Sequence, residues 1–232
     1  MTVTSATYDQ YRGRLEAYFD RTALDAWAQL TSDAPVSGIR ATVRAGRDRM
    51  RSTLLSWLPD DMTGLRLLDA GCGTGALAVE AARRGAHVVA IDVSASLIEI
   101  ARERAPRDLN GGAIDFRAGD MMDPSLGTFD HVVAMDSLIH YRTDDIVAVL
   151  SSLSARTDGS ILFTVTPRTA PLMMMLAMGK LFPRADRAPA IAPADLHALA
   201  MRLSALEGRG VGRGRRISGG FYTSQAVELL RR

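Results

Sequence analysis

The sequence contains a single cysteine, Cys72, a single lysine, Lys180, and no long apolar run. One cysteine cannot form an internal disulfide, which excludes a disulfide-stapled secreted domain and favours a reducing cytoplasm. The longest apolar stretch, Ala170 to Gly179, falls well short of the ~20 residues that a membrane-crossing helix needs. The first ten residues are polar and lack the apolar core of a signal peptide. We therefore expect a cytoplasmic protein with at most peripheral membrane contact.

The sequence also lacks a large excess of charge of one sign. It has 28 basic and 26 acidic residues, which give a net charge of +2. This balance is too even to demand a nucleic-acid partner, and we expect none. The 232 residues are 47% hydrophobic. That is enough for one full α/β core with an appended segment.

Short apolar runs alternate with helical patterns from residue 64 onward. Strands are expected near 65–70, 87–92, 112–117, 129–135 and 160–166, and helices near 75–84, 94–105 and 143–156. Such alternation favours a parallel sheet flanked by helices. Two further strand-like segments follow, Val211 to Ile217 and Phe221 to Leu230. The sequence thus predicts an α/β fold.

Two segments lie outside this alternation. Residues 1–58 form a predicted N-terminal helical arm, with helices over Tyr8 to Ala28 and Val36 to Leu58. Residues 168–207 form a predicted helical lid insertion within the domain 59–232. Ligands of open α/β sheets lie beyond the carboxyl ends of the strands, and long connections there form lids. We therefore expect these two segments to select the substrate.

Four arginines, Arg40, Arg44, Arg47 and Arg51, share one face of the second arm helix. This stripe has two interpretations. It is either an ordinary solvated helix face or a basic rim that clamps a carboxylate-bearing substrate. On the second interpretation Arg44 and Arg47 are the candidate substrate-binding residues.

The insertion contains a methionine-rich run from Pro171 to Phe182 that includes Met174. Methionine packs adaptably against flat aromatic surfaces, so the run suits a large planar ligand. A core helix or a dimer face would use the same composition. Both interpretations stay open on the sequence.

The most informative stretch runs from Asp69 to Ala78, where a predicted strand ends in the alternating glycines Gly71, Gly73 and Gly75 and then becomes helical. Such a turn lets a ligand approach bare backbone. The spacing also fits a dinucleotide site, but Asp69, Asp92 and Asp120 each follow or end a predicted strand. Acids aimed at a pyrophosphate would repel it, whereas they suit a cation.

This pattern resembles the class I S-adenosylmethionine-dependent methyltransferases, which implies a Rossmann-like, mostly parallel seven-stranded sheet ending in an antiparallel hairpin. The resemblance implies that Asp69 and the glycine turn hold the methionine end, Asp92 the ribose hydroxyls, and Asp120 the adenine amino group with Met121 beside the ring. The implied cofactor-binding residues are Asp69, Gly71, Cys72, Gly73, Gly75, Asp92, Val93, Asp120, Met121, Met135 and Asp136.

Several further motifs are spread over essentially the whole chain: Tyr18-Phe19 with Trp27, Arg44-x-Gly46, Trp57-Leu58, the run Asp136 to Tyr141, which includes Leu138-Ile139-His140-Tyr141, and Phe221-Tyr222-x-Ser224. Together they resemble the magnesium protoporphyrin IX O-methyltransferase family. The resemblance implies methylation of a propionate carboxylate by S-adenosylmethionine, giving a monomethyl ester in bacteriochlorophyll biosynthesis. His140 and Tyr18 are the expected catalytic residues, and the expected substrate-binding residues are Arg44, Arg47, Tyr141 and Met174.

Magnesium would enter this reaction as part of the porphyrin, because the sequence has no cluster with metal-ligand spacing. The resemblance also implies a magnesium chelatase subunit as candidate partner and a location in the cytoplasm or at the inner or photosynthetic membrane. In one departure, Leu30-Thr31-Ser32 stands where relatives have an Ile-Tyr-Gly-like turn.

Three rival functions remain on the sequence alone. One is another small-molecule O- or N-methyltransferase with a quinone-like acceptor, which would share every cofactor residue. Another is an RNA or protein methyltransferase, suggested by the Gly/Arg run at 208–216. The last is a binding protein that kept the fold, although a degraded glycine turn would be expected there.

Overall fold

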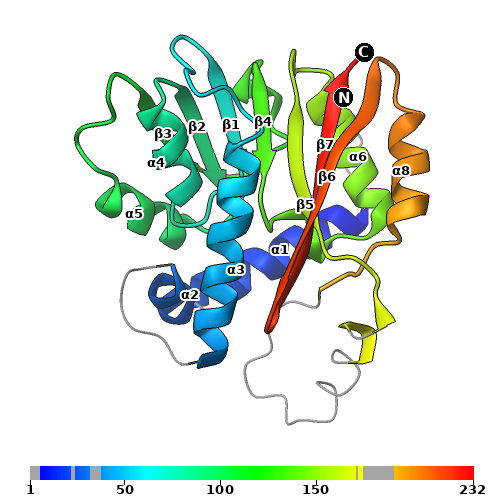
Figure 1. The fold of residues 1–232 in the computed structure, drawn as a ribbon. Helices are drawn as coiled ribbons and strands as arrows, with labels where there is room; N and C mark the ends of the chain where they lie inside the picture. Colours follow the sequence, from blue (N-terminus) through cyan, green and yellow to red (C-terminus); the bar gives the residue numbers. More distant parts are fainter. Residues whose placement is uncertain (1–5, 22–23, 32–37, 171, 175–190) are drawn as a thin grey trace.

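The computed structural model describes residues 6–21, 24–31, 38–170, 172–174 and 191–232 of the 232-residue chain. Its centre is one seven-stranded sheet with the strand order β3-β2-β1-β4-β5-β7-β6 (Figure 1). The strands are β1 (Arg66–Ala70), β2 (His87–Asp92), β3 (Ala113–Ala118), β4 (His131–Ala134), β5 (Ile161–Val165), β6 (Arg209–Gly219) and β7 (Tyr222–Arg231). The first five are parallel, and β7 is antiparallel to both β5 and β6. This confirms the predicted Rossmann-like sheet and its terminal hairpin.

Helices cover both faces of the sheet because neighbouring strand residues point to opposite sides. Leu67 of β1 belongs to one buried core cluster and Leu68 to the other. The first cluster includes residues of α3 (Gly38–Leu55), α4 (Ala76–Arg83) and α5 (Ala95–Arg104). The second includes residues of α1 (Ala6–Arg21), α6 (Thr143–Ser154) and α8 (Leu196–Ser204).

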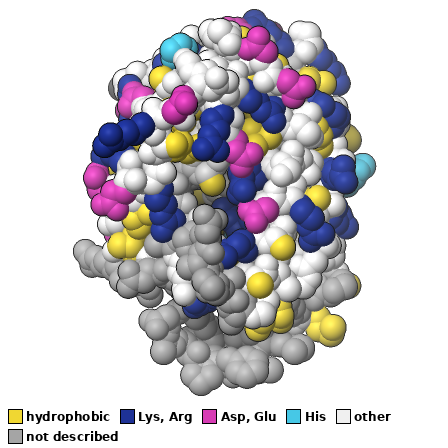
Figure 2. All heavy atoms as spheres, turned by 60° about the vertical axis from the view of Figure 1, so that its left-hand side comes forward, with side chains coloured by type: hydrophobic (Ala, Val, Ile, Leu, Met, Phe, Trp, Pro, Cys, Tyr) yellow, Lys and Arg dark blue, Asp and Glu magenta, His cyan; other side chains and the backbone are white. Residues whose placement is uncertain are grey.

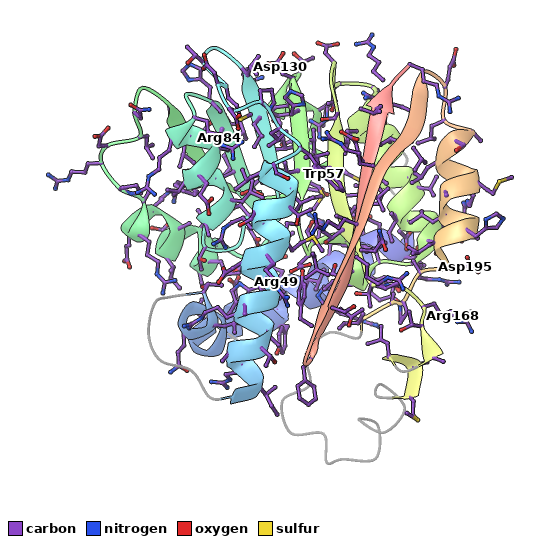
Figure 3. The ribbon with its side chains drawn as sticks, in the orientation of Figure 1. Arg49, Trp57, Arg84, Asp130, Arg168 and Asp195 are labelled. Atoms are coloured by element: carbon purple, nitrogen blue, oxygen red, sulfur yellow. The ribbon has the colours of Figure 1, made fainter. Side chains whose placement is uncertain are left out.

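The second half of the predicted insertion packs on the sheet as helix α8. Its helix α8 contacts β6 and α6, and Asp195 caps it by accepting hydrogen bonds from the backbone N–H groups of His197 and Ala198 (Figure 3). This part of the insertion is therefore a cover of the sheet. Residues 172–174 are helical, whereas 191–195 are not. The methionine-rich run beyond Met174 lies outside the described residues.

The arm is attached to the carboxyl-end side of the sheet by side chains of α1. The Tyr8 hydroxyl donates to Asp120 Oδ1 at 2.7 Å, and Ser94 Oγ at the start of α5 donates to Asp20 Oδ1 at 2.5 Å. The predicted single helix over Tyr8 to Ala28 is wrong, because α1 ends at Arg21 and a separate helix α2 (Leu24–Leu30) follows. Figure 1 shows both helices beside the lower part of the sheet, on the side of the β6–β7 hairpin tip.

A glycine allows α3 to pack closely on that hairpin. Gly46 is buried in the middle of α3, and a Cβ there would lie 2.5 to 2.7 Å from carbon atoms of the Tyr222 side chain. A residue without a Cβ is therefore needed where α3 packs on the hairpin. Tyr222 is the first residue of β7, so the contact fixes the arm against the end of the sheet.

We expect Gly46→Ala to lower the free energy of unfolding by roughly 1–3 kcal/mol, because the added methyl overpacks the Tyr222 contact. Urea unfolding measures this. Gly13→Ala is the matched control, since Gly13 lies within α1 and a Cβ added there would have no other heavy atom within 4 Å. Gly13→Ala should therefore raise the free energy of unfolding by about 1 kcal/mol, through helix propensity alone. Equal effects of the two substitutions would contradict the packing role of Gly46.

Candidate functional site

A cavity of about 600 Å³ lies where the carboxyl ends of the parallel strands meet the arm. This size is typical of a small-molecule site. Most residues predicted from the sequence line it: Tyr18, Arg44, Arg47, Asp69, Gly71, Cys72, Gly73, Asp92, Val93, Met121, Met135, Asp136, His140 and Tyr141. Three do not, namely Gly75, Asp120 and Met174. The strand ends thus bring together residues that lie up to 123 positions apart in the sequence, from Tyr18 to Tyr141.

The glycine turn forms the floor of the cavity. Gly71, Gly73 and Gly75 all have positive φ angles, of 84°, 55° and 79°. A Cβ on Gly71 would lie 2.3 Å from Cβ of Ser137, and one on Gly75 would lie 2.8 Å from the Phe116 ring. Gly71 and Gly75 therefore serve the close packing of the turn. Gly71 and Gly73 both line the cavity, and, among the described residues, a Cβ on Gly73 would have only Trp27 Nε1 within 4 Å, at 3.3 Å.

Asp92 holds the turn in this shape. Its Oδ2 accepts a hydrogen bond from Gly73 N at 2.8 Å, and its Oδ1 accepts one from Ser94 N at 3.0 Å. Burial raises the pKa of Asp92, while these two bonds to backbone N–H groups oppose the rise. The carboxylate lines the cavity and keeps further lone pairs for a ligand.

Asp69 is the least satisfied polar group in this floor. It is 1% exposed, and its Oδ2 has no hydrogen-bond partner among the described residues. Burial, followed by the nearby charge of Asp92, raises the pKa of Asp69 to about 7. Two buried acids with an unpaired oxygen between the strand ends favour a positively charged ligand. This is the electrostatic character that the sequence predicted.

Two further residues of the predicted cofactor site, Cys72 and Asp120, have structural roles. Burial raises the pKa of the Cys72 thiol well above its usual range, so it stays protonated and unreactive. Asp120 Oδ1 accepts hydrogen bonds from the Tyr8 hydroxyl at 2.7 Å and from Met122 N at 2.8 Å. The Asp120 carboxylate is thus bound to the arm and lies outside the cavity lining, whereas its neighbour Met121 lines the cavity.

Aromatic side chains of the arm form the opposite wall. Tyr18, Phe19 and Trp27 line the cavity, with Phe19 in edge contact with the other two rings. Tyr141 stacks on Tyr8 with ring centroids 5.1 Å apart. Tyr141 is therefore fixed by the arm in addition to lining the cavity, an arrangement that the sequence did not indicate.

The arginine stripe of α3 connects parts of the arm and the sheet. Arg44 donates to the backbone carbonyls of Leu30 and Gln29 at the end of α2, at 2.9 and 2.7 Å. Arg47 Nη1 pairs with Asp136 Oδ2 at 2.7 Å, and Arg51 pairs with Glu80 and Asp48. In the face seen in Figure 2, basic side chains are interspersed with acidic ones. Arg44, Arg47 and Arg51 are thus engaged with other residues of the protein. They form neither the solvated helix face nor the open carboxylate clamp that the sequence allowed.

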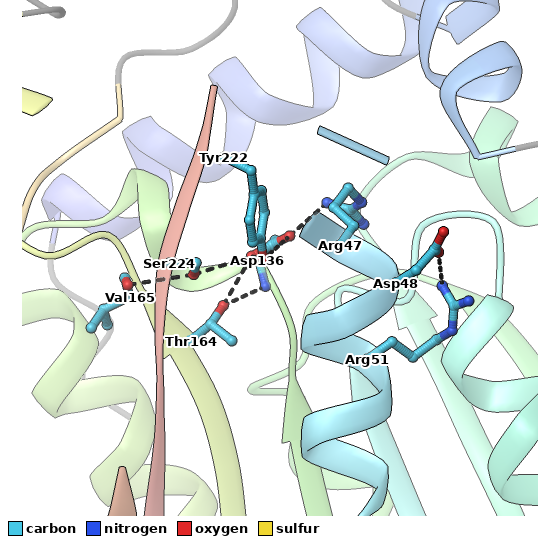
Figure 4. Close-up of polar contacts among 8 residues, drawn as sticks. All are labelled: Arg47, Asp48, Arg51, Asp136, Thr164, Val165, Tyr222 and Ser224. Carbon is cyan, nitrogen blue, oxygen red and sulfur yellow. Dashed lines mark hydrogen bonds and ion pairs between the residues drawn. The ribbon is translucent and has the colours of Figure 1, made fainter. Parts of the chain in front are cut away.

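Asp136 is the centre of a buried polar network that joins α3 to three strands (Figure 4). Besides Arg47, its carboxylate accepts hydrogen bonds from the Tyr222 hydroxyl at 3.1 and 3.2 Å, Thr164 Oγ1 at 3.2 Å and Ser224 Oγ at 3.4 Å. Its backbone has a φ of 54°, which is unusual for a residue other than glycine. From the sequence, Asp136 is expected to bind the cofactor and Arg47 the substrate. In the structure the two side chains pair with each other.

His140 ends the short helix Leu138–His140 that follows β4. It is 9% exposed and lines the cavity, so little water reaches its ring. In the insertion, Met174 is 64% exposed and does not line the cavity, whereas Leu172, two residues earlier, is buried and does. The apolar lining from this segment therefore comes from another residue than the one predicted.

Within the ranges that the structure describes, no group of three or more His, Cys, Asp or Glu side chains is arranged to hold a metal ion. None of the helices in those ranges is both long and apolar enough to cross a membrane.

Comparisons with known proteins agree with this geometry. Residues 134–231 match the family model described as the magnesium-protoporphyrin IX methyltransferase C-terminus, and residues 67–157 match a general methyltransferase domain. A magnesium-protoporphyrin O-methyltransferase of Rhodobacter capsulatus is 54% identical over 95% of this chain and 97% of its own. One from Synechocystis sp. is 30% identical over 92% and 94%.

Among solved structures, the magnesium protoporphyrin IX methyltransferase from Synechocystis PCC 6803 with bound SAH is similar, with a TM-score of 0.85 and 27% identity. The match covers 95% of this chain and all of the other. The similarity therefore extends over the arm as well as the sheet.

The raised pKa of Asp69 predicts a pH-dependent cost of folding. The pKa of Asp69 is near 4 in the unfolded chain and about 7 in the folded one. The contribution of this group to stability is therefore fully present below pH 4 and is lost as the pH rises through 7. We expect Asp69→Asn to stabilise the protein at pH 8, by a few kcal/mol at most, and much less at pH 5. Thermal unfolding at both pH values measures this.

Asp61→Asn is the control with the opposite sign. Asp61 is exposed, and hydrogen bonds from Thr63 lower its pKa, so its contribution is present above pH 4. Asp61→Asn should therefore bring a small loss of stability at both pH 5 and pH 8. An Asp69→Asn effect of the same size at pH 5 and pH 8 would rule out a raised Asp69 pKa.

Proposed function

The chain belongs to the magnesium-protoporphyrin IX methyltransferase family, and we propose that it transfers a methyl group from S-adenosylmethionine to a propionate carboxylate of magnesium protoporphyrin IX. The observation that carries the proposal is the acidic, glycine-floored cavity in a chain that is 54% identical to a relative of this activity over nearly its whole length. The magnesium ion is part of the substrate. The product is the monomethyl ester.

The described residues fit S-adenosylmethionine better than a dinucleotide. The unpartnered Oδ2 of buried Asp69 suits the ammonium group, and Asp92, next to the exposed backbone of Gly73, suits the ribose hydroxyls. A pyrophosphate at the same floor would face two buried carboxylates and gain no positive side chain from the turn. Met121 and Val93 supply apolar contacts for the adenine ring.

Asp120, the predicted partner of the adenine amino group, also has contacts with the arm. Asp120 already accepts hydrogen bonds from Tyr8 and Met122 N and lies outside the cavity lining. We therefore assign Asp120 to attachment of the arm. Both hydrogen bonds go to Oδ1, so Oδ2, which lies 3.7 Å from Arg12 Nε, keeps lone pairs for a further donor.

Bound S-adenosylmethionine supplies a methyl group on a sulfonium, which becomes a neutral thioether when the methyl carbon bonds to the carboxylate oxygen. A propionate is already ionised at neutral pH, so the protein does not need a strong base. Its task is to orient the carboxylate and exclude water, which can contribute several kcal/mol to lowering the barrier. We assign the orienting hydrogen bond to His140, which also takes up any residual proton.

Tyr18 is proposed to close the site from the arm. Its ring lines the cavity beside Phe19 and Trp27. A dry wall of this kind favours the reaction, because the carboxylate and sulfonium charges neutralise each other as the methyl group moves. Tyr141 and Leu172 provide further apolar surface for the macrocycle.

We also propose that a magnesium chelatase subunit delivers the porphyrin and that any membrane contact is peripheral. An apolar macrocycle is poorly solvated by water, which favours direct delivery. Exposed apolar side chains near the cavity, Phe221 (53% exposed) and Ile191 (36% exposed), support such contacts because both also line it.

The direct test incubates the purified protein with S-adenosylmethionine and magnesium protoporphyrin IX and follows the monomethyl ester by chromatography. We expect ester formation that depends on both substrates. Methylation of a quinone-like acceptor without any porphyrin ester would replace this proposal with the rival small-molecule function.

We expect His140→Ala to lower kcat by roughly a hundredfold or more while the affinity for S-adenosylhomocysteine changes little. The reason is that His140 orients the carboxylate and does not belong to the glycine floor. The control is His197→Ala, since His197 is exposed on α8 and does not line the cavity. Full turnover by His140→Ala would remove His140 from the mechanism.

A further inference from the structure

Trp27 is placed by α2 directly against the glycine turn. Its indole Nε1 is the nearest atom to the space beside Gly73, where a Cβ would lie 3.3 Å away. The ring also lines the cavity, and none of the described residues accepts a hydrogen bond from its N–H. The indole therefore offers an apolar face and a donor at the position where a ligand on the turn would lie.

The orientation of this indole depends on Arg47. The guanidinium carbon of Arg47 lies 4.6 Å from the centre of the Trp27 ring, which is a cation–π contact. The rings of Phe19 and Trp27 meet edge to face, with centroids 5.4 Å apart. Trp27 and Arg47 come from different helices, α2 and α3. The stack therefore fixes how α2 lies over the turn.

Arg47 is in turn oriented by Asp136. The ion pair measures 2.7 Å, and its side chains are only 19% and 4% exposed. Asp136 cannot easily follow a displaced arginine, because Tyr222, Thr164 and Ser224 donate to its carboxylate from β7 and β5 (Figure 4). Burial raises the pKa of Tyr222, so its hydroxyl remains a donor. The chain of contacts thus runs from the sheet to the indole.

We propose that Trp27 contacts the cofactor and that Arg47 and Asp136 are positioning residues that hold its indole against the glycine turn. The inference deepens the proposed function and rests on the cofactor-binding part of it. It gives the arm a role at the cofactor in addition to its role at the porphyrin.

The ion pair also has an electrostatic function. A ligand with a sulfonium and an ammonium group would be repelled by an unpaired arginine in the cavity wall. Asp136 neutralises Arg47, so the guanidinium can stack on Trp27 without opposing the cation. Removing either partner should therefore change the preference between S-adenosylmethionine, which carries the sulfonium charge, and S-adenosylhomocysteine, which does not.

The charge effect separates this role from a purely structural one. We expect Asp136→Asn to weaken S-adenosylmethionine binding by roughly threefold more than S-adenosylhomocysteine binding, because Arg47 is left unpaired. Arg47→Gln should shift the ratio the other way, and the double variant should restore it. Calorimetric titration of the full chain with each ligand measures both affinities.

Trp27 itself is tested by fluorescence. The sequence has two tryptophans, so Trp57→Phe leaves Trp27 as the only emitter. Addition of S-adenosylhomocysteine should change this emission, and Trp27→Ala should weaken its binding by roughly tenfold. Where Arg47→Gln does not fold, Arg47→Lys keeps the charge and loses the planar stack, and its affinity should lie between those of the wild type and Trp27→Ala.

The chain offers a matched control with the same chemistry away from the cavity. Arg213 lies over the Trp57 ring at 5.2 Å and pairs with Glu228 at 2.6 Å, and none of the three lines the cavity. Figure 3 shows Trp57 beside the end of α3. Arg213→Gln and Glu228→Gln should leave the ratio of the two affinities unchanged.

Unchanged Trp27 emission on ligand binding, or identical affinity ratios in wild type, Asp136→Asn and Arg47→Gln, would overturn the inference. Failure of the proposed function would look different. In that case the protein would bind S-adenosylhomocysteine with the expected Trp27 response and yet form no porphyrin ester.

Discussion

Two carboxylates buried at neighbouring strand ends, Asp69 and Asp92, are the constraint on which the site depends. They lie on β1 and β2, which pair in parallel, so both side chains reach the same edge of the sheet. Each would be costly there without compensation. Asp92 receives it from the backbone N–H groups of Gly73 in the turn and of Ser94 at the start of α5, whereas Asp69 keeps one oxygen without a partner among the described residues. The glycines allow the turn to bend towards these acids, and the result is a floor that attracts positive charge.

The arm completes this floor as a wall of the same cavity. Its attachments are spread along the edge of the sheet, from Tyr8 on Asp120 through Asp20 on Ser94 to Arg47 on Asp136. Each pair joins an arm residue to a residue that follows a parallel strand. These three attachments hold the arm over the acids. The similarity to relatives likewise extends over the arm and is not limited to the sheet.

The strands and the glycine turn could be predicted because they depend on local patterns. The predicted strand 87–92 has the observed bounds of β2, and the alternating glycines of the turn all have positive φ angles. The partners of charged side chains could not be predicted. Tyr8 and Asp120 are 112 residues apart, and Arg47 and Asp136 are 89 apart. A helical stripe of arginines has the same sequence pattern whether it faces water, a substrate or buried acids, so only the tertiary structure distinguishes these cases.

The network around Asp136 indicates why the arm and the sheet need to be matched in charge. Methyl transfer from a sulfonium to a carboxylate begins with two opposite charges and ends with none, so a wall with uncompensated charge would favour one side of the reaction. Arg47 and Asp136 cancel each other within the wall, whereas the two buried acids Asp69 and Asp92 lie in the floor of the same cavity. The fold supplies strand ends for many chemistries. A floor with buried acids and a wall whose charges are paired suit a cationic methyl donor and an anionic acceptor.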